Sequence, residues 1–318
     1  MEPKYSIIIP HYNIPDLLMR CLKSIPVMEE IEVIVVDDNS PDAATYIEKY
    51  PELSRPHLAF IRTTKGGEAG YARNVGMEHA RGNWLLFADA DDLFVDNMYD
   101  IISQWFDSDA DVVFFKNRIV SSDYLNHVFS GMNVYNDCID KCITLGDERF
   151  VRLMFDVPWG KLIKSNFVEN RGFRFDEVTY GNDAFFSFCT GYYARKVDAT
   201  DTILYVHTRR TESLSGTFCS KPGELAVRAD VKFRIQKKYK ELRIDFEPPR
   251  TFMWYLMKLW KRDKMLFRYY WRRVDEAYPS KFIAFQKLTK GRGKRFKVKL
   301  GLYSLWIWLQ PLSNFRKA

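Results

Sequence analysis

Short apolar runs alternate with amphipathic stretches over the first 115 residues of the chain. The apolar runs are short enough for strands, and the stretches between them carry apolar residues at helical spacing. The predicted strands are residues 5–9, 31–36, 58–61, 84–88 and 111–115, and the predicted helices are residues 13–25, 41–50, 68–80 and 97–106. This alternation is typical of a mainly parallel sheet covered on both faces. The pattern therefore predicts an α/β fold.

Three of these strands run directly into polar clusters. The clusters are Pro-His-Tyr-Asn at 10–13, Asp-Asp-Asn at 37–39 and Asp-Ala-Asp-Asp at 89–92. Ligands of open α/β sheets bind outside the carboxyl ends of the strands. We expect the three clusters to share one edge of the sheet and to form a binding site there.

The cluster at 89–92 carries the most specific chemistry. Carboxylates two residues apart at a strand end, such as Asp89 and Asp91, can approach one hard cation that bridges the two phosphates of a nucleotide diphosphate. The alternative is that the acidic residues cap the helix that begins near Asp96, and for Asp92 both interpretations stay open. For Asp89 and Asp91 we favour the metal, because an acidic pair beside a buried strand is costly without a cation.

Two further segments fit a nucleotide, each with an open alternative. Asp37 and Asp38 could bind a base and a ribose, or could form an Asx turn that leads into Ser40 as a helix cap. Residues 66–74 are glycine-rich but lack the spacing of a P-loop or a dinucleotide fingerprint. Arg73 in this segment could reach a diphosphate or lie on the surface.

Four blocks together resemble the family 2 glycosyltransferases, which are inverting enzymes with a GT-A fold. The blocks occur in the family's order and cover roughly the first 95 residues: YSIIIPHYN at 5–13, EVIVVDDNSPD at 32–42, GYARNVG at 70–76 and WLLFADADD at 84–92. The resemblance implies Mn²⁺ or Mg²⁺ as cofactor and a sugar donor that is activated with UDP.

The resemblance also assigns roles to individual residues. It implies that the nucleoside pocket is lined by Pro10, Tyr12, Asp37 and Asp38. Arg73 would lie near the base or phosphate. Asp89 and Asp91 would form the metal motif, with Asp91 as the direct ligand.

Two later blocks resemble the acceptor half of the family. The block at 180–186 (YGNDAFF) usually has an acidic pair whose last carboxylate is the general base; here Asn182 takes the first position and Asp183 the second. One carboxylate is enough to deprotonate an acceptor hydroxyl, so Asp183 is the predicted base, although it could also cap the helix at 184–193. In the block at 158–164, Trp159 could stack on a sugar or pack in the core, and Lys161 could reach a phosphate or the acceptor.

His207 ends a further predicted strand before the Ser-Leu-Ser-Gly segment at 213–216. Some GT-A enzymes use a late histidine as an extra metal ligand, whereas a lone histidine at a strand end is often structural. Both interpretations stay open.

Charge separates the C-terminal part from the rest. The net charge is +7, yet residues 250–318 hold 18 Lys and Arg against 3 Asp and Glu. Predicted helices at 226–241 and 252–277 are followed by a basic stretch at 287–299 and an apolar one at 300–309. A cationic run beside an aromatic, apolar segment is typical of a protein on an anionic membrane, so residues 281–318 are a predicted membrane-surface region. The alternative is a solvated helical domain; nothing in the first part of the chain favours nucleic acid.

These observations predict a GT-A domain at 1–220 and a basic, aromatic-rich helical domain at 221–318. Five scattered cysteines, no leader segment and no apolar run of about 20 residues predict a cytoplasmic protein, peripheral on the inner membrane face. The predicted function is metal-dependent, inverting transfer of a sugar from a nucleotide diphosphate to a hydroxyl of a lipid-linked acceptor or a cell-surface glycan, such as a polysaccharide or lipopolysaccharide. The alternatives are a sugar nucleotidyltransferase, which the glycine-free segment at 5–13 disfavours, and a non-catalytic nucleotide-sugar or glycan-binding scaffold.

Overall fold

The computed structural model describes residues 2–64, 66–129, 131, 133–209, 223–246 and 251–309. The chain divides into two compact units, Met1–Phe218 and Cys219–Ala318. The boundary predicted at residue 220 lies outside the described residues, as does the segment at 213–216.

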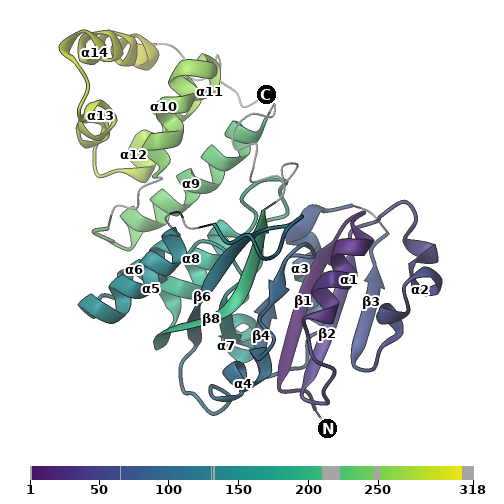
Figure 1. The fold of residues 1–318 in the computed structure, drawn as a ribbon. Helices are drawn as coiled ribbons and strands as arrows, with labels where there is room; N and C mark the ends of the chain where they lie inside the picture. The colour runs from purple at the N-terminus through teal and green to yellow at the C-terminus, as the bar shows by residue number, and fades with distance from the viewer. Residues whose placement is uncertain are drawn as a thin grey trace. The chain divides into compact units, whose positions relative to one another are not determined.

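The first unit contains one eight-stranded sheet with the order β3-β2-β1-β4-β7-β6-β8-β5 (Figure 1). The strands are β1 Tyr5–His11, β2 Ile31–Asp37, β3 Leu58–Arg62, β4 Trp84–Phe87, β5 Leu93–Phe94, β6 Val112–Ser121, β7 Lys161–Lys164 and β8 Val197–Arg209. Strands β3, β2, β1 and β4 are parallel neighbours, and β6 is parallel to β8. Antiparallel β7 joins the two groups by pairing with β4 and β6. The predicted α/β sheet is confirmed, and β7 with the short β5 makes it mixed.

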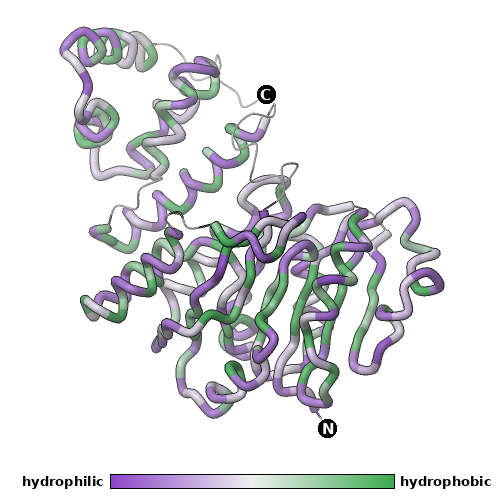
Figure 2. Tube along the Cα trace, in the orientation of Figure 1, coloured by the Kyte–Doolittle hydropathy of each residue, from purple (hydrophilic) through white to green (hydrophobic). Residues whose placement is uncertain are grey.

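Helices cover both faces of this sheet. In the first unit they are α1 Pro15–Lys23, α2 Tyr46–Lys49, α3 Glu68–His79, α4 Met98–Ser103, α5 Val134–Leu145, α6 Arg149–Met154, α7 Ser165–Arg171 and α8 Ala184–Tyr193. Ile7 and Ile9 of β1 share a core cluster with Leu18 and Leu22 of α1. Ile8 points to the other face, where α3 packs. Apolar residues fill the strands between these layers (Figure 2).

The helix predicted at 41–50 is broken. Residues Ala43–Thr45 form a 3₁₀ turn, and α2 has only four residues. The Ser40 hydroxyl oxygen, expected to cap this helix, instead accepts from the backbone N–H of Asn13 (2.8 Å), while the hydroxyl donates to Asp37 Oδ2 (2.6 Å). Asn13 likewise does not cap α1; it has a positive φ of 52°, and its backbone N–H donates to Ser40 Oγ.

Gly76 allows α3 to pack closely on β1. A Cβ at this position would lie 2.4 Å from Cγ2 of the fully buried Ile8. Overpacking of a core costs about 1–3 kcal/mol, so Gly76→Ala should lower the melting temperature by several degrees. Thermal denaturation measures this, with Gly131→Ala as control because no atom lies within 4 Å of a Cβ there. Equal melting temperatures for the two variants would contradict the close packing.

The second unit is helical. It contains α9 Glu224–Glu241, α10 Phe252–Arg262, α11 Lys264–Arg272, α12 Val274–Ala277, α13 Lys281–Thr289 and α14 Lys294–Leu309. Phe233, Phe252 and Tyr270 form its aromatic centre, with ring centroids 5.0–5.5 Å apart. The single helix predicted at 252–277 divides at Asp263, whose carboxylate accepts from the backbone N–H of Leu266 and so starts α11. Among the described residues, no helix is long and apolar enough to cross a membrane.

Candidate active site

The carboxyl ends of β1, β2 and β4 meet at one edge of the sheet, as the sequence predicts. His11 and Asp37 are paired in the β1–β2 register, and Ile8 pairs with Phe87 just before Asp89. The polar clusters that follow these strands therefore lie side by side.

Asp37 organises the loop at the end of β2. It is fully buried, and its carboxylate accepts from His11 Nδ1 (2.8 Å), from Ser40 Oγ and from the Ser40 backbone N–H. Burial alone would raise the pKa of Asp37, but these hydrogen bonds outweigh it and hold the pKa below its ordinary value. His11 Nε2 accepts from the N–H of Ile14, so the same network fixes the start of α1. Of the two interpretations of Asp37, the structure shows the turn.

The neighbouring residues differ in access to solvent. Pro10 is buried within β1, whereas the side chain of Tyr12 is 58% exposed. Asp38 is mostly buried and accepts from the backbone N–H of Gly67 (2.9 Å), which ties the β2 loop to the start of α3. Tyr12 and Asp38 thus flank the edge at which a nucleoside is expected.

Asp92 anchors the loop after β4 to β8. It is fully buried and accepts from the hydroxyl of Tyr205 (2.8 Å), from the backbone N–H of Thr208 (2.6 Å) and from His207 Nδ1 (3.1 Å). It does not cap α4, where Asn97 holds the N-cap position. The capping interpretation of Asp92 is therefore wrong, because its carboxylate is occupied by β8.

These anchors leave the two aspartates of the predicted metal motif partly exposed. The backbone N–H of Asp89 donates to the Tyr205 hydroxyl (2.9 Å), and the carbonyl of Asp91 accepts from Arg20 Nη2 (2.8 Å) and Thr208 Oγ1 (2.7 Å). The side chain of Asp89 is 34% exposed. Sequence reasoning missed Arg20, because it lies within an amphipathic helix and reaches the loop only after folding.

The ring of His207 is held by a hydrogen bond to Asp92. Its Nδ1 donates to Asp92, which leaves Nε2 as the ring nitrogen that can face a cation. Burial would lower the pKa of His207, but the hydrogen bond to Asp92 and the nearby charges of Asp89 and Asp91 raise it. Over the residues that the structure describes, no group of three or more His, Cys, Asp or Glu side chains is close enough to hold a metal by itself. Such a partial ligand set fits Mn²⁺ or Mg²⁺, since Mg²⁺ is usually held by one or two carboxylates together with substrate phosphates and water.

Arg73 connects Asp89, at the end of β4, with Asn182, which lies just before α8. The guanidinium donates through Nη2 to Asp89 Oδ1 (2.6 Å) and through Nη1 to Asn182 Oδ1 (2.8 Å). The arginine is 5% exposed, and its buried Nε has no hydrogen-bond partner among the described residues. Arg73 is therefore not the surface arginine of the alternative interpretation. Asn182, which departs from the family pattern, is its anchor.

Asp183 lies beside this pair at the N-cap position of α8. Its side chain makes no capping hydrogen bond, so the capping interpretation is wrong. Burial raises the pKa of Asp183 to about 6, Arg73 acts in the opposite direction, and Asp156 and Asp89 raise it further. A carboxylate with this pKa is ionised at neutral pH and is a better proton acceptor than an ordinary one.

Helix α3 positions the segment that carries Asp183. Asn74 exchanges two hydrogen bonds with the backbone of Phe175 (2.9 and 3.0 Å). A Cβ on Gly70 would lie 2.0 Å from the carbonyl oxygen of Asp176, so only glycine permits this approach. The block at 70–76 thus holds the acceptor-side segment as well as Arg73, a role that sequence reasoning missed.

Trp159 and Lys161 belong to the core. Trp159 is 5% exposed and stacks on Tyr205 and His207, with centroids 5.1 and 5.5 Å away, which is the packing alternative rather than sugar stacking. Lys161 is 1% exposed, and its ammonium donates to the carbonyl of Phe155 (2.8 Å). Burial lowers the pKa of Lys161 to about 7. The expectation that Lys161 reaches a phosphate or the acceptor is corrected by this burial.

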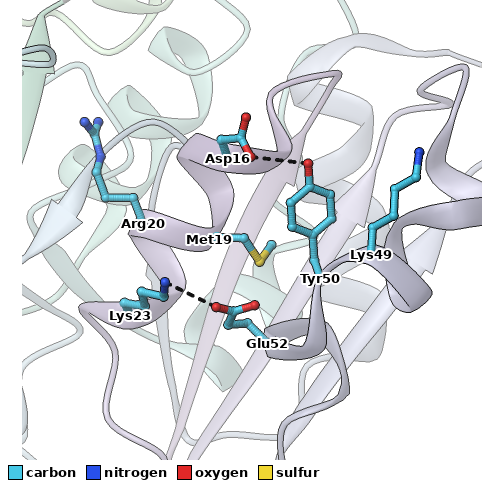
Figure 3. A pocket seen from close by; sticks show the side chains of 7 residues that line it. All are labelled: Asp16, Met19, Arg20, Lys23, Lys49, Tyr50 and Glu52. Atoms are coloured by element: carbon cyan, nitrogen blue, oxygen red, sulfur yellow. Dashed lines mark hydrogen bonds and ion pairs between the residues drawn. The ribbon is translucent and has the colours of Figure 1, made fainter.

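A separate surface pocket contains none of the predicted site residues (Figure 3). It lies between α1 and the α2 region, where Tyr50 donates to Asp16 (3.3 Å) and Lys23 pairs with Glu52 (3.3 Å). Of the charged lining residues, Lys23 and Glu52 pair with each other.

Comparison with known proteins shows the family of the chain. Residues 6–172 match the family model described as Glycosyl transferase family 2, and the chain belongs to this family. Its relatives include glycosyltransferase GlyA of Streptococcus pneumoniae, 26% identical over 239 residues that cover 70% of this chain and 33% of GlyA. The putative glycosyltransferase EpsH of Bacillus subtilis is 26% identical over 214 residues, which cover 64% of this chain and 60% of EpsH. The chain thus spans about a third of the one relative and three fifths of the other.

A third relative is named for its substrate. It is the GalNAc(5)-diNAcBac-PP-undecaprenol beta-1,3-glucosyltransferase of Campylobacter jejuni, 27% identical over 57% of this chain and 58% of that protein. Among solved structures, residues 1–349 of S. aureus TarS in complex with UDP-GlcNAc match with a TM-score of 0.62 and 21% identity, covering 98% of this chain and 89% of that one. This likeness confirms the GT-A fold.

Proposed function

We propose that the chain transfers a sugar from a UDP-sugar to a hydroxyl group of a lipid-linked acceptor or a cell-surface glycan, with inversion at the sugar carbon. The observation that carries the proposal is the junction of Arg73 with Asp89 and Asn182, because it brings the end of β4 next to Asp183. The Arg73 guanidinium thereby joins the donor-side carboxylate of Asp89 to the amide of Asn182, the residue directly before Asp183. The bound UDP-GlcNAc of TarS and the undecaprenol-linked substrate of the Campylobacter relative support the choice of donor and acceptor.

On the donor side, Tyr12 and Asp38 would contact the nucleoside, while Asp37 and Pro10 hold the loop and strand that carry them. Asp91 would hold Mn²⁺ or Mg²⁺ together with phosphate oxygens and water, and Asp89 and His207 would have to move closer to join it as ligands. The metal would neutralise charge on the leaving diphosphate. Arg73 has a buried Nε that finds no hydrogen-bond partner in the part of the chain that the structure describes. A buried unsatisfied donor costs about 1–3 kcal/mol, which a phosphate oxygen of the donor would recover.

On the acceptor side, Asp183 is the proposed general base. An inverting transfer needs one group to take the proton of the attacking hydroxyl on the face opposite the leaving group. The pKa of about 6 leaves Asp183 ionised at neutral pH. Asn182 is neutral, so it adds no second negative charge beside Asp183. Of the two side chains to which Arg73 donates, only Asp89 carries a charge.

Nucleotide diphosphate release from a panel of UDP-, GDP- and dTDP-sugars tests this function. We expect release from one UDP-sugar in the presence of Mn²⁺ or Mg²⁺, and loss of that release with EDTA that returns when the metal is added back. Release of pyrophosphate from a nucleoside triphosphate would favour the nucleotidyltransferase instead. Binding of a nucleotide sugar without release, even with extracts of lipid-linked glycans, would favour the non-catalytic scaffold.

A further inference from the structure

Helix α14 has an exposed apolar stripe. Val298, Leu302 and Leu305 are 54%, 67% and 58% exposed. They are spaced i, i+4 and i+7, which aligns them along one side of a helix. Three large aliphatic side chains thus form a continuous exposed row.

The stripe lies opposite the face by which α14 packs in its own unit. Leu300, Ser304 and Ile307 are almost fully buried, and the ring of Tyr303 lies 5.0 Å from that of Trp260 in α10. At about 100° per residue, the buried positions lie roughly 180° from the stripe. The core of the second unit therefore does not use the stripe.

Cations flank the stripe on both sides. Lys297 and Lys299 are exposed and lie about 100° to either side of Val298, and the exposed Lys294 and Arg295 precede them. Residues 294–309 contain no Asp or Glu. Long cationic side chains beside an apolar row can lay their stems along it while the charges reach outward.

A groove in the same unit repeats this combination of charge and apolar surface. Five cations line it, from α10 and from the end of α13 with the residues that follow: Lys258, Lys261, Lys287, Lys290 and Arg292. The other lining residues are two methionines, a leucine and Trp254, whose ring lies 4.8 Å from the Lys258 ammonium. No acidic side chain lines the groove. Such a lining fits a phosphate group attached to a hydrocarbon.

We propose that the outer face of α14 and this α10 groove bind the surface of a membrane that contains anionic phospholipid. The stripe enters the boundary between headgroups and acyl chains, the flanking cations meet lipid phosphates, and the groove holds a phosphate with the adjoining apolar part of one lipid. This inference rests on the proposed function, because membrane binding would bring the enzyme to the surface where a lipid-linked acceptor is presented. A second copy of the chain is a poorer partner for the stripe, because it would bring the same cations against each other.

Co-sedimentation of the full chain with vesicles tests the proposal. The vesicles are phosphatidylcholine alone and phosphatidylcholine mixed with phosphatidylglycerol. We expect binding to the mixed vesicles only. The double variant Lys297→Gln/Lys299→Gln should weaken that binding by about 30-fold, since each cation near an anionic surface contributes about 1 kcal/mol. Leu302→Gln/Leu305→Gln should weaken it by 10-fold or more through lost apolar burial.

Two controls keep the outcomes distinct. Leu125→Gln changes an exposed apolar residue of the first unit and should leave vesicle binding unchanged. Size-exclusion chromatography of Leu302→Gln/Leu305→Gln shows whether the stripe instead joins two copies. Equal binding to both vesicle types, unchanged binding of both double variants, or a dimer that only the leucine variant loses would overturn the proposal. Nucleotide diphosphate release is measured on the same proteins, so that absent release with intact vesicle binding refutes the proposed function alone.

Discussion

Asp183→Asn should lower the rate of sugar transfer by about 10²–10⁴-fold, the contribution of a positioned general base. The amide keeps the size of the side chain but accepts no proton. Because Asp183 makes no capping hydrogen bond to α8, the substitution removes no structural contact of that kind. We expect binding of the UDP-sugar to persist, because Asp183 is placed on the acceptor side.

The pH dependence gives a second readout of the same residue. The pKa of about 6 predicts that kcat/KM of the unaltered enzyme rises with pH through about 6 and then levels off. The residual activity of Asp183→Asn should lack this rise.

The raised pKa of Asp183 also affects the stability of the folded protein. When folding raises the pKa of a carboxyl group, the folded protein loses stability as the pH rises from the pKa of that group in the unfolded chain through about 6. Asp183→Asn should therefore be at least as stable as the unaltered protein at neutral pH. Asp201→Asn, an exposed aspartate on β8, is the matched control. A variant at position 183 that is fully active, or one that loses activity only because it unfolds, would contradict the role as base.

Asp91→Asn should lower metal-dependent nucleotide diphosphate release by about 10²–10³-fold, the range found when one electrostatic stabiliser of a reaction is removed. The position of Asp91 is fixed through its main chain, since Arg20 and Thr208 both donate to its carbonyl oxygen. The asparagine variant keeps these contacts and should fold normally. Titration of UDP binding with and without Mn²⁺ should show that the metal no longer strengthens binding.

The adjacent aspartate provides a contrast. Asp92 is fully buried among Tyr205, His207 and Thr208, so Asp92→Asn should mainly lower the melting temperature. The exposed Asp96 provides a neutral control as Asp96→Asn. Release by Asp91→Asn within threefold of the unaltered protein, together with insensitivity to EDTA, would refute the metal motif.

Several elements were predictable because their signals are local. The parallel strands β1, β2 and β4 are mostly apolar runs, and their burial on both faces requires that composition, whereas β3 at the edge of the sheet is only partly buried. The clusters at their ends follow from the same rule, since parallel strands bring their carboxyl ends to one edge. The family resemblance then supplied what spacing could not, namely the expected ligand and the proposed role of Asp183.

Other roles depend on contacts between distant residues. Nothing near Asp92 in the sequence distinguishes it from Asp91, yet β8 takes up one carboxylate and leaves the other partly exposed. Trp159 and Lys161 lie in a block typical of the family, but both became buried because β8 and Phe155 pack against them. The break in the helix predicted at 41–50 has the same origin, since the Ser40 hydroxyl is taken up by the backbone N–H of Asn13 and by Asp37.

The sequence by itself therefore determined the sheet, its binding edge, the acidic motif at the end of β4 and the charge contrast between the two parts of the chain. Only the tertiary structure decided that Arg73 connects Asp89 to Asn182, that Arg20 secures the backbone of Asp91, and that one face of α14 stays exposed. The physical reason is the range of the interactions. Strands and helices follow from periodicity over a few residues, whereas a buried hydrogen bond between residues about 100 positions apart forms only once packing has excluded water from both partners.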